Sequence, residues 1–126
     1  MARTPVRTSP PEIRRGAIWR VELDPMRGSE IRKTRPAVVL SADGLNRARR
    51  TVVVVPLFTG SASRRPLVVP VPSASEDSVA VCDQIRAMDR TRLTRRDGAL
   101  TREDMRALED SVRAVLVLRP AMPGQG

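Results

Sequence analysis

Apolar residues in the first two thirds of the chain form short runs that are typical of β-strands. Segment 17–23 (AIWRVEL) alternates between two faces, which predicts a half-buried strand. The runs at 37–41 (AVVLS) and 51–57 (TVVVVPL) are continuous and rich in β-branched residues, so they predict buried strands. We expect further strands at 67–71 (LVVPV) and 78–88 (SVAVCDQIRAM), the latter as one long strand or two bent ones.

The last third of the chain changes to a helical period. Segment 89–98 (DRTRLTRRDG) has the composition of a charged connector with room for one helical turn. Thr101 predicts a helix N-cap, with Asp104 three residues later as a variant of the capping box. Apolar residues then recur at helical spacing as far as Pro120. They are Met105, Leu108, Val112, Val115 and Leu116.

This apolar stripe must pack on something, and the strands are the only candidates. We therefore expect a mainly β (α+β) domain, in which a small, strongly bent antiparallel sheet or barrel is closed by a C-terminal helix. A chain of 126 residues suits one such domain. We place it at 14–118, between tails at 1–13 and 119–126 that are expected to be disordered from their composition. The N-terminal tail lacks the apolar region of a secretory signal.

The charge balance points towards polyanions. The chain has 23 Lys+Arg against 14 Asp+Glu, a formal net charge of +9. Such an excess suits nucleic acid, an acidic partner protein or an anionic membrane surface. Lys33 is the only lysine, so a codon bias towards arginine is an alternative explanation. No apolar stretch approaches the roughly 18–20 residues that cross a membrane.

Two residue types limit the chemistry. The chain has no histidine, which excludes Ser-His-Asp triads, histidine general bases and histidine-ligated zinc. It has one cysteine, Cys82, which excludes an intrachain disulfide and a cysteine cluster for metal. In its apolar run Cys82 is expected to be a small buried hydrophobic residue. We therefore expect a cytoplasmic protein with no metal and no cofactor.

A charged segment stands directly before the predicted strand at 37–41. Segment 28–41 (GSEIRKTRPAVVLS) places Glu30 and Arg35 close to that strand. RNA can be cleaved without histidine or metal when its own 2′-hydroxyl is the nucleophile. The protein then needs a carboxylate as base, an arginine for the phosphorane and a hydroxyl donor. Glu30, Arg35 and a nearby threonine or serine would suffice, although a solvated charged loop is the alternative.

Further polar clusters suit RNA binding. Asp83, Gln84 and Arg86 interrupt a strand-like run, and as a strand Gln84 and Arg86 would share one face. The alternative is an ordinary exposed strand face. Arg64 and Arg65 lie in a predicted loop at 60–66, as phosphate contacts or as solvated side chains. The only large aromatic residues are Trp19 and Phe58, too few for a base-stacking platform, and Trp19 is expected to pack in the core.

Several stretches together resemble the MazF/PemK family of toxin endoribonucleases. They are RRGAIWRVELDPMRGSE (14–30), KTRPAVVLSADGLNR (33–47), VVVVPL (52–57), DSVAVCDQIRAMDRTRL (77–93) and the helix TREDMRALEDSVRAVLVL (101–118). The resemblance implies an SH3-like barrel with helices that works as a homodimer. It implies sequence-specific, metal-independent cleavage of single-stranded RNA, leaving a 2′,3′-cyclic phosphate and a 5′-hydroxyl. It also implies neutralisation by an acidic antitoxin whose tail occupies the RNA groove.

The resemblance assigns roles to individual residues. Arg35 matches the catalytic arginine of the family, and Glu30 matches an acidic residue implicated in some members. The catalytic hydroxyl of the family follows the V-P-x stretch, where this chain has Phe58. Thr59 comes one residue later, with Ser61 as the fallback, and a shift of one residue in a strand reverses the facing of its side chains.

One branch of the family gives a base role to the aspartate that matches Asp83. That branch also uses an arginine where Val81 stands and a histidine where Ser29 stands, so its mechanism cannot run intact here. We therefore predict Arg35, Thr59 and Glu30 as the catalytic residues. The residues predicted to bind RNA are Ser29, Ser41, Asn46, Arg64, Arg65, Asp83, Gln84 and Arg86. Two alternatives remain open: a non-catalytic toxin of the same fold class that poisons DNA gyrase, and an RNA-binding module without activity.

Overall fold

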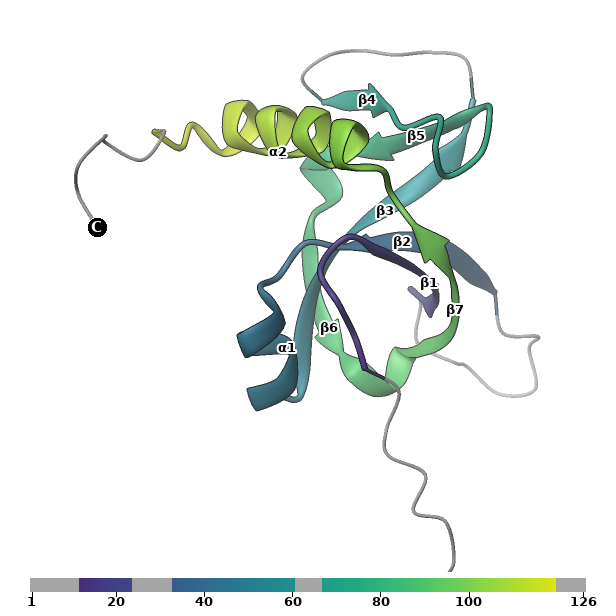
Figure 1. Cartoon of the computed structure of the whole chain (residues 1–126), viewed down its shortest axis with the longest axis vertical. Helices are drawn as coiled ribbons and strands as arrows, with labels where there is room; N and C mark the ends of the chain where they lie inside the picture. Colours follow the sequence, from purple (N-terminus) through teal and green to yellow (C-terminus); the bar gives the residue numbers. More distant parts are fainter. Residues whose placement is uncertain (1–11, 24–32, 61–66, 120–126) are drawn as a thin grey trace, which may run out of the picture.

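The computed structural model describes residues 12–23, 33–60 and 67–119 (Figure 1). The strands are β1 (Ala17–Glu22), β2 (Thr34–Val39), β3 (Thr51–Thr59), β4 (Val68–Pro70), β5 (Ser78–Val81), β6 (Arg86–Asp89) and β7 (Leu93–Ala99). The α-helices are α1 (Asp43–Ala48) and α2 (Arg102–Leu116), and the 3-10 helices are η1 (Cys82–Gln84) and η2 (Arg90–Arg92). The strands pair in the order β4-β5-β3-β2-β1-β7, and β6 also pairs with β3. Every pairing is antiparallel, so the predicted mainly β fold with a C-terminal helix is confirmed.

The long strand β3 is the central strand of the sheet and pairs with β2, β5 and β6. Its first half pairs with β6 from Thr51 to Val54, and its last three residues pair with β5 from Leu57 to Thr59. Between these two partners the chain turns through η1, so the segment predicted at 78–88 is two strands joined by a bend. The predicted alternation of Gln84 and Arg86 on one strand face is therefore wrong, because η1 ends the strand before Gln84.

Continuous apolar runs form buried strands because both faces of the sheet are covered. Neighbouring residues enter two different clusters, as Val54 and Val55 of β3 do. One cluster lies beneath α2 and includes Leu108. The other surrounds Trp19, which is only 4% exposed, so its predicted packing role is confirmed. This burial on both faces fixes the register of β1, β2 and β3. A slip of one residue would move each side chain from one cluster to the other.

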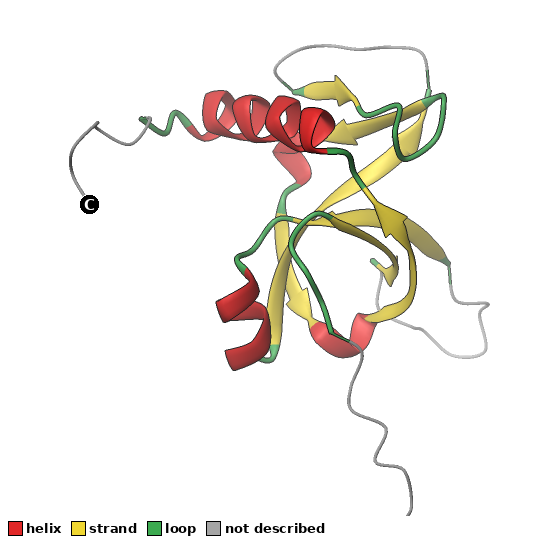
Figure 2. Cartoon of the chain, in the orientation of Figure 1, coloured by secondary structure: helices red, strands yellow, loops and turns green. Residues whose placement is uncertain are grey.

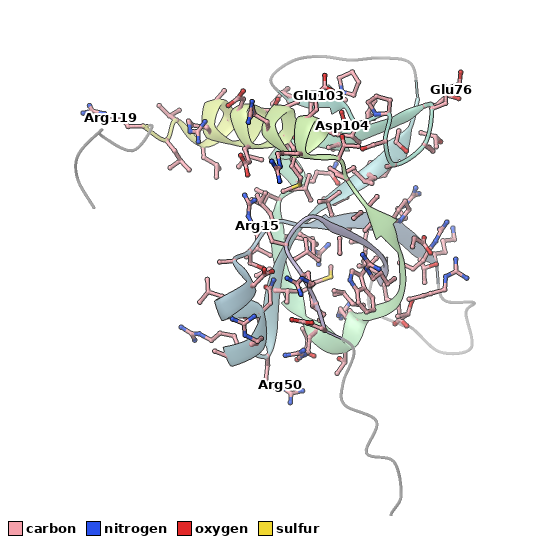
Figure 3. The ribbon with its side chains drawn as sticks, in the orientation of Figure 1. Arg15, Arg50, Glu76, Glu103, Asp104 and Arg119 are labelled. Atoms are coloured by element: carbon pink, nitrogen blue, oxygen red, sulfur yellow. The ribbon has the colours of Figure 1, made fainter. Side chains whose placement is uncertain are left out.

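Helix α2 lies across the sheet near β4 and β5 (Figure 2). The Thr101 side chain accepts a hydrogen bond from the Asp104 backbone N–H at 3.2 Å, which confirms the predicted N-cap. The Asp104 carboxylate does not return to Thr101 as a capping box requires. It accepts the backbone N–H of Ser73 at 2.7 Å and so joins the helix to the turn after β4. Figure 3 shows Asp104 at the start of α2, beside that turn.

Two elements differ from the sequence-based expectation. Residues 93–99, expected within a charged connector, form β7, whose side chains are mostly exposed and therefore lack an apolar pattern. The strand pairs only with β1, at one end of the sheet order. The short helix α1 follows the second strand and was not predicted from the sequence. In the described ranges no helix is both long enough and apolar enough to cross a membrane.

Candidate active site

A pocket of about 320 Å³ opens where β1, β2, β3 and β7 meet the turn before β5. Its polar lining residues are Arg20, Thr34, Arg35, Thr59, Ser75, Ser78 and Asp97. The structure therefore brings together Arg35 and Thr59, two of the three residues predicted to be catalytic. The third, Glu30, lies outside the described residues.

Arg35 stands in the second position of β2, with Val21 of β1 as its cross-strand partner. Pro36 follows, and Ala37 then pairs with Pro56 of β3. The strand is therefore held by β1 at Arg35 itself and by β3 from Ala37 onward, which gives the guanidinium a fixed origin. The guanidinium carbon lies 4.9 Å from the centroid of the Phe58 ring, in cation–π geometry. The exposed Arg35 side chain therefore lies against Phe58, the residue at the position where the resemblance predicts a hydroxyl.

Thr59 ends β3 next to two serines. It is exposed and pairs with Ser78 of β5. The Ser78 hydroxyl lies 2.5 Å from that of Ser75, and both serines line the pocket. With Thr34 of β2, the described lining of the pocket thus carries four hydroxyls. Sequence reasoning missed Ser75 and Ser78, because the segment 72–77 gave only a loop signal and the pairing partner of Thr59 was unknown.

A second cation reaches the same pocket from β1. Arg20 donates from Nε to Asp97 at 2.9 Å, and Arg95 donates from Nε to the other oxygen of that carboxylate at 3.0 Å. Both Arg20 and Asp97 line the pocket. The described lining carries two arginines, Arg20 and Arg35, and one carboxylate, Asp97. The site therefore has a net positive charge, which suits a phosphate. Sequence reasoning missed this pair because β7 carries no strand pattern.

Asp83, Gln84 and Arg86 are exposed but do not line this pocket. Arg86 pairs with Val54, five residues before Thr59 on β3, a separation of roughly 17 Å along the strand. Within one chain the structure therefore separates this cluster from Arg35. Four more residues predicted to bind or cut RNA, and the fallback hydroxyl, lie outside the described residues: Ser29, Glu30, Arg64, Arg65 and Ser61.

Ser41 and Asn46 have structural roles. Asn46 is 1% exposed, and its side-chain amide donates to the Ser41 carbonyl at 3.0 Å. The Ser41 hydroxyl in turn donates to the Asn46 side-chain oxygen and accepts the Val53 backbone N–H at 3.0 Å. These bonds attach α1 to β3. The RNA contact predicted for Asn46 is therefore not supported, because its polar atoms are buried and used inside the chain.

Cys82 is fully buried, as predicted. Burial, with a smaller effect of the Asp83 charge, raises the pKa of its thiol to about 11. The thiol therefore stays protonated near neutral pH and is no nucleophile. Among the residues that the structure describes, no group of three or more His, Cys, Asp and Glu could hold a metal ion.

Comparisons with known proteins identify the family and the fold of the chain. Residues 14–116 match the family model of the PemK-like, MazF-like toxin of type II toxin–antitoxin systems. The endoribonuclease MazF9 of Mycobacterium tuberculosis is 35% identical over 84% of this chain and 98% of its own length. The endoribonuclease PemK of Escherichia coli is 36% identical over 62% of each chain.

Solved structures show the same fold. An endoribonuclease from a mycobacterial species superposes with a TM-score of 0.73 at 22% identity, over 88% of this chain and 97% of that one. An endoribonuclease solved with its cognate antitoxin, also mycobacterial, has a TM-score of 0.69 at 20% identity, over 86% and 98% of the two chains. With a family model that matches residues 14–116 and a curated relative matched over 98% of its length, the chain belongs to the PemK-like, MazF-like toxins of type II toxin–antitoxin systems.

Proposed function

We propose that the chain is a toxin endoribonuclease that cuts single-stranded RNA by internal attack of the 2′-hydroxyl. The observation that carries the proposal is the pocket in which Arg35 and Thr59 meet beside Ser75 and Ser78. Membership of the toxin family supports it, as do two curated relatives that are named endoribonucleases. The products would be a 2′,3′-cyclic phosphate and a 5′-hydroxyl.

In the proposed reaction the 2′-oxygen bonds to phosphorus and the bond from phosphorus to the 5′-oxygen breaks. Glu30 takes the proton of the 2′-hydroxyl, or positions Arg35. The Arg35 guanidinium pairs with the equatorial oxygens of the phosphorane, whose charge is greatest in the transition state. The leaving 5′-oxygen takes a proton from water while Arg35 donates a hydrogen bond to it. Thr59 donates a further hydrogen bond to the phosphate. None of these steps requires a metal ion, because the nucleophile belongs to the RNA.

Arg20 adds positive charge at the pocket wall. Its bond to Asp97 holds it there, and Arg95 shares the same carboxylate. Asp97 is less suited to be the base, because each of its two carboxylate oxygens already accepts a guanidinium hydrogen bond. We assign Asp97 to positioning Arg20 and assign Arg20 to a phosphate next to the one that is cut.

The same proposal includes a homodimer, an acidic antitoxin partner and a cytoplasmic location. A solved neighbour of this fold is a complex with its cognate antitoxin, and the net charge of +9 suits both an acidic protein and RNA. Asp83 and Gln84 of η1 and Arg86 of β6 do not line the pocket of their own chain, so in a dimer they would serve RNA held between protomers.

The decisive experiment incubates the pure protein with a long single-stranded RNA in EDTA. The wild type should cut at a limited set of sites, and the new 5′ ends should accept phosphate from a kinase without prior dephosphorylation. Arg35→Ala should lose cutting by at least about 100-fold, the effect of removing one group that stabilises the transition state. Arg96→Ala is the matched control, because Arg96 is an exposed arginine of β7 outside the pocket. RNA left intact by the wild type would refute the proposal.

One observation favours a second candidate, an RNA-binding module without activity. Phe58 stands where the family resemblance expects a hydroxyl, and its ring contacts Arg35. In that case the wild type would bind RNA and leave it uncut, so the same assay, read beside a binding measurement, separates the two functions.

A further inference from the structure

A second concave surface lies at the other end of β3. A hollow of about 530 Å³ is formed by residues 12–13, the end of α1 with the turn after it, and η2. Half of its eight lining residues are arginines: Arg47, Arg49, Arg50 and Arg90. We name these four residues the arginine corner. Glu12 is the one acidic residue among the lining residues that the structure describes, so the hollow carries a net positive charge.

Tertiary contacts hold the frame of the arginine corner. The Arg90 guanidinium donates from Nη1 to the Asn46 carbonyl at 2.9 Å and to the Arg49 carbonyl at 3.3 Å. The Arg90 backbone N–H donates to the Arg50 carbonyl at 2.7 Å. Asn46 is itself buried and bonded to Ser41. The turn between α1 and β3 is thus fixed before any ligand arrives, which lowers the ordering cost of binding.

The exposed arginines of the corner are free to bind a ligand at small cost. Figure 3 shows Arg50 projecting beyond the end of β3, below α1. Its ion pair with Asp89 spans 3.6 Å and the side chain is 78% exposed, so the pair contributes little to stability. Asp89 also accepts hydrogen bonds from the Thr91 backbone and hydroxyl at 2.9 and 2.7 Å. Moving Arg50 to a ligand therefore leaves the carboxylate with partners.

The chemistry of the lining favours phosphate over an acidic protein segment. Guanidinium groups bind phosphate oxygens in pairs. An acidic peptide that folds on its partner also buries apolar side chains, and the hollow offers only Ile13 and Ala48 for that purpose. From Thr51 to Thr59, β3 spans about 26 Å, so the corner is too far from Thr59 to act in the cleavage step.

We propose that the arginine corner is a second phosphate-binding surface, which holds single-stranded RNA away from the cleavage pocket. This inference rests on the proposed function for the identity of the polyanion. It gives the RNA two anchoring regions on one protomer, one at each end of β3. The corner would raise affinity for RNA without regard to sequence, because phosphate contacts carry no base information.

The test measures binding of a fluorescein-labelled, mixed-sequence single-stranded RNA in EDTA, in an Arg35→Ala background that prevents cutting. The corner variant carries Arg47→Gln, Arg49→Gln and Arg50→Gln, all at exposed positions, and keeps Arg90 because that residue supports the turn. The control variant carries Arg102→Gln, Arg106→Gln and Arg113→Gln on α2, so both lose three positive charges. Equal melting temperatures of the two variants establish that both are folded.

The salt dependence gives the expected result. Each phosphate contact to single-stranded RNA contributes about 0.7 to the slope of log affinity against log salt, so the corner variant should lose roughly 2 from the slope of its parent. Over a fourfold rise in salt the parent should therefore lose about 20-fold more affinity than the corner variant. The control variant should keep the slope of the parent. Equal slopes in corner variant and parent, or equal losses in both triple variants, would overturn the proposal.

Two further arms separate this inference from its alternatives. Binding of labelled poly-glutamate that falls only in the corner variant, while RNA binding is unchanged, would overturn RNA in favour of an acidic protein. Cleavage by the protein with Arg35 intact is scored separately on the same RNA. A corner-dependent salt slope in a protein that does not cut would support the phosphate-binding surface and refute only the nuclease assignment.

Discussion

The Arg35 guanidinium lies over the face of the Phe58 ring, 4.9 Å from its centroid. The two residues come from adjacent antiparallel strands, β2 and β3, and both line the pocket. Phe58 stands where the resemblance to the family leads us to expect a hydroxyl, and it contacts Arg35, the arginine that the resemblance predicts to be catalytic. We infer that Phe58 is a positioning residue, which restricts the guanidinium to the pocket by a cation–π contact.

Replacing Phe58 by leucine should lower kcat for RNA cleavage about fivefold and leave KM nearly unchanged. A cation–π contact at an exposed site contributes about 1 kcal/mol, and its loss frees the guanidinium to adopt unproductive rotamers. Single-site cleavage kinetics with a mapped RNA substrate would measure both constants. Phe58→Tyr is the control, because it keeps the ring face and should keep kcat. Equal kcat values for the leucine and tyrosine variants would contradict the positioning role.

Removing the hydroxyl of Thr59 should lower kcat about 100-fold, the effect of losing one hydrogen-bond donor to a developing anion. Thr59→Val keeps the shape of the side chain, and Thr59→Ser keeps the hydroxyl and should retain most activity. If Thr59→Val cuts as fast as the wild type, another hydroxyl of the pocket lining supplies the donor: that of Thr34, Ser75 or Ser78. Adding Phe58→Thr to Thr59→Val then tests whether the family position can restore cutting.

The sequence predicts the strands that are buried on both faces better than the elements at the edges. Strand β3 could be predicted from its run of valines, because a strand that is buried on both faces consists of consecutive apolar, β-branched residues. Strand β7 could not be found in this way, because six of its seven residues are not buried. Its strand state comes from pairing with β1, a tertiary contact that no local pattern records.

The residues of the site also differ in whether a local sequence pattern or a tertiary contact places them. The position of Arg35 beside a buried strand could be predicted from the run of apolar residues that follows it. The pairing of Arg20 with Asp97 could not, because the two residues are 77 positions apart and meet only through the β1–β7 register. The presence of Ser78 at the site could not be predicted either, because it depends on the pairing of Ser78 in β5 with Thr59 in β3. For Asn46 the error is the reverse. It was predicted to bind RNA, but its side chain is buried and supports the fold.

Asp104→Ala should lower the free energy of unfolding by about 2–3 kcal/mol, because it leaves the backbone N–H of Ser73 without its charged acceptor. The carboxylate is 9% exposed, so water cannot fully replace it. Urea unfolding followed by circular dichroism would measure the loss. Asp110→Ala on the exposed side of α2 is the control and should change stability by less than about 0.5 kcal/mol. Similar losses in both variants would show that Asp104 does not join the helix to the turn.

Val117→Gly should stabilise the chain by about 0.5–1 kcal/mol. Val117 ends α2 in the left-handed region at φ 56°, where a β-branched residue is strained and glycine is not. The side chain is 85% exposed, so little packing is lost. Ala114→Gly, three residues earlier inside the helix, should destabilise by about 1 kcal/mol. Thermal unfolding of the two variants should therefore shift in opposite directions, and a fall in both would refute the strain.

Stability should fall as pH rises from about 9 to about 11, because of Cys82. Burial raises the pKa of its thiol from 9.0 to about 11, so in this window the unfolded chain releases the proton and the folded chain keeps it. The folded state binds more protons, so the free energy of unfolding decreases, by up to roughly 2–3 kcal/mol across the window. The chain has no tyrosine and one lysine, so few other groups titrate there. Urea midpoints of Cys82→Ala should be lower at pH 8 but should decline less between pH 9 and 11. Parallel curves for wild type and variant would show that the buried thiol is not the cause.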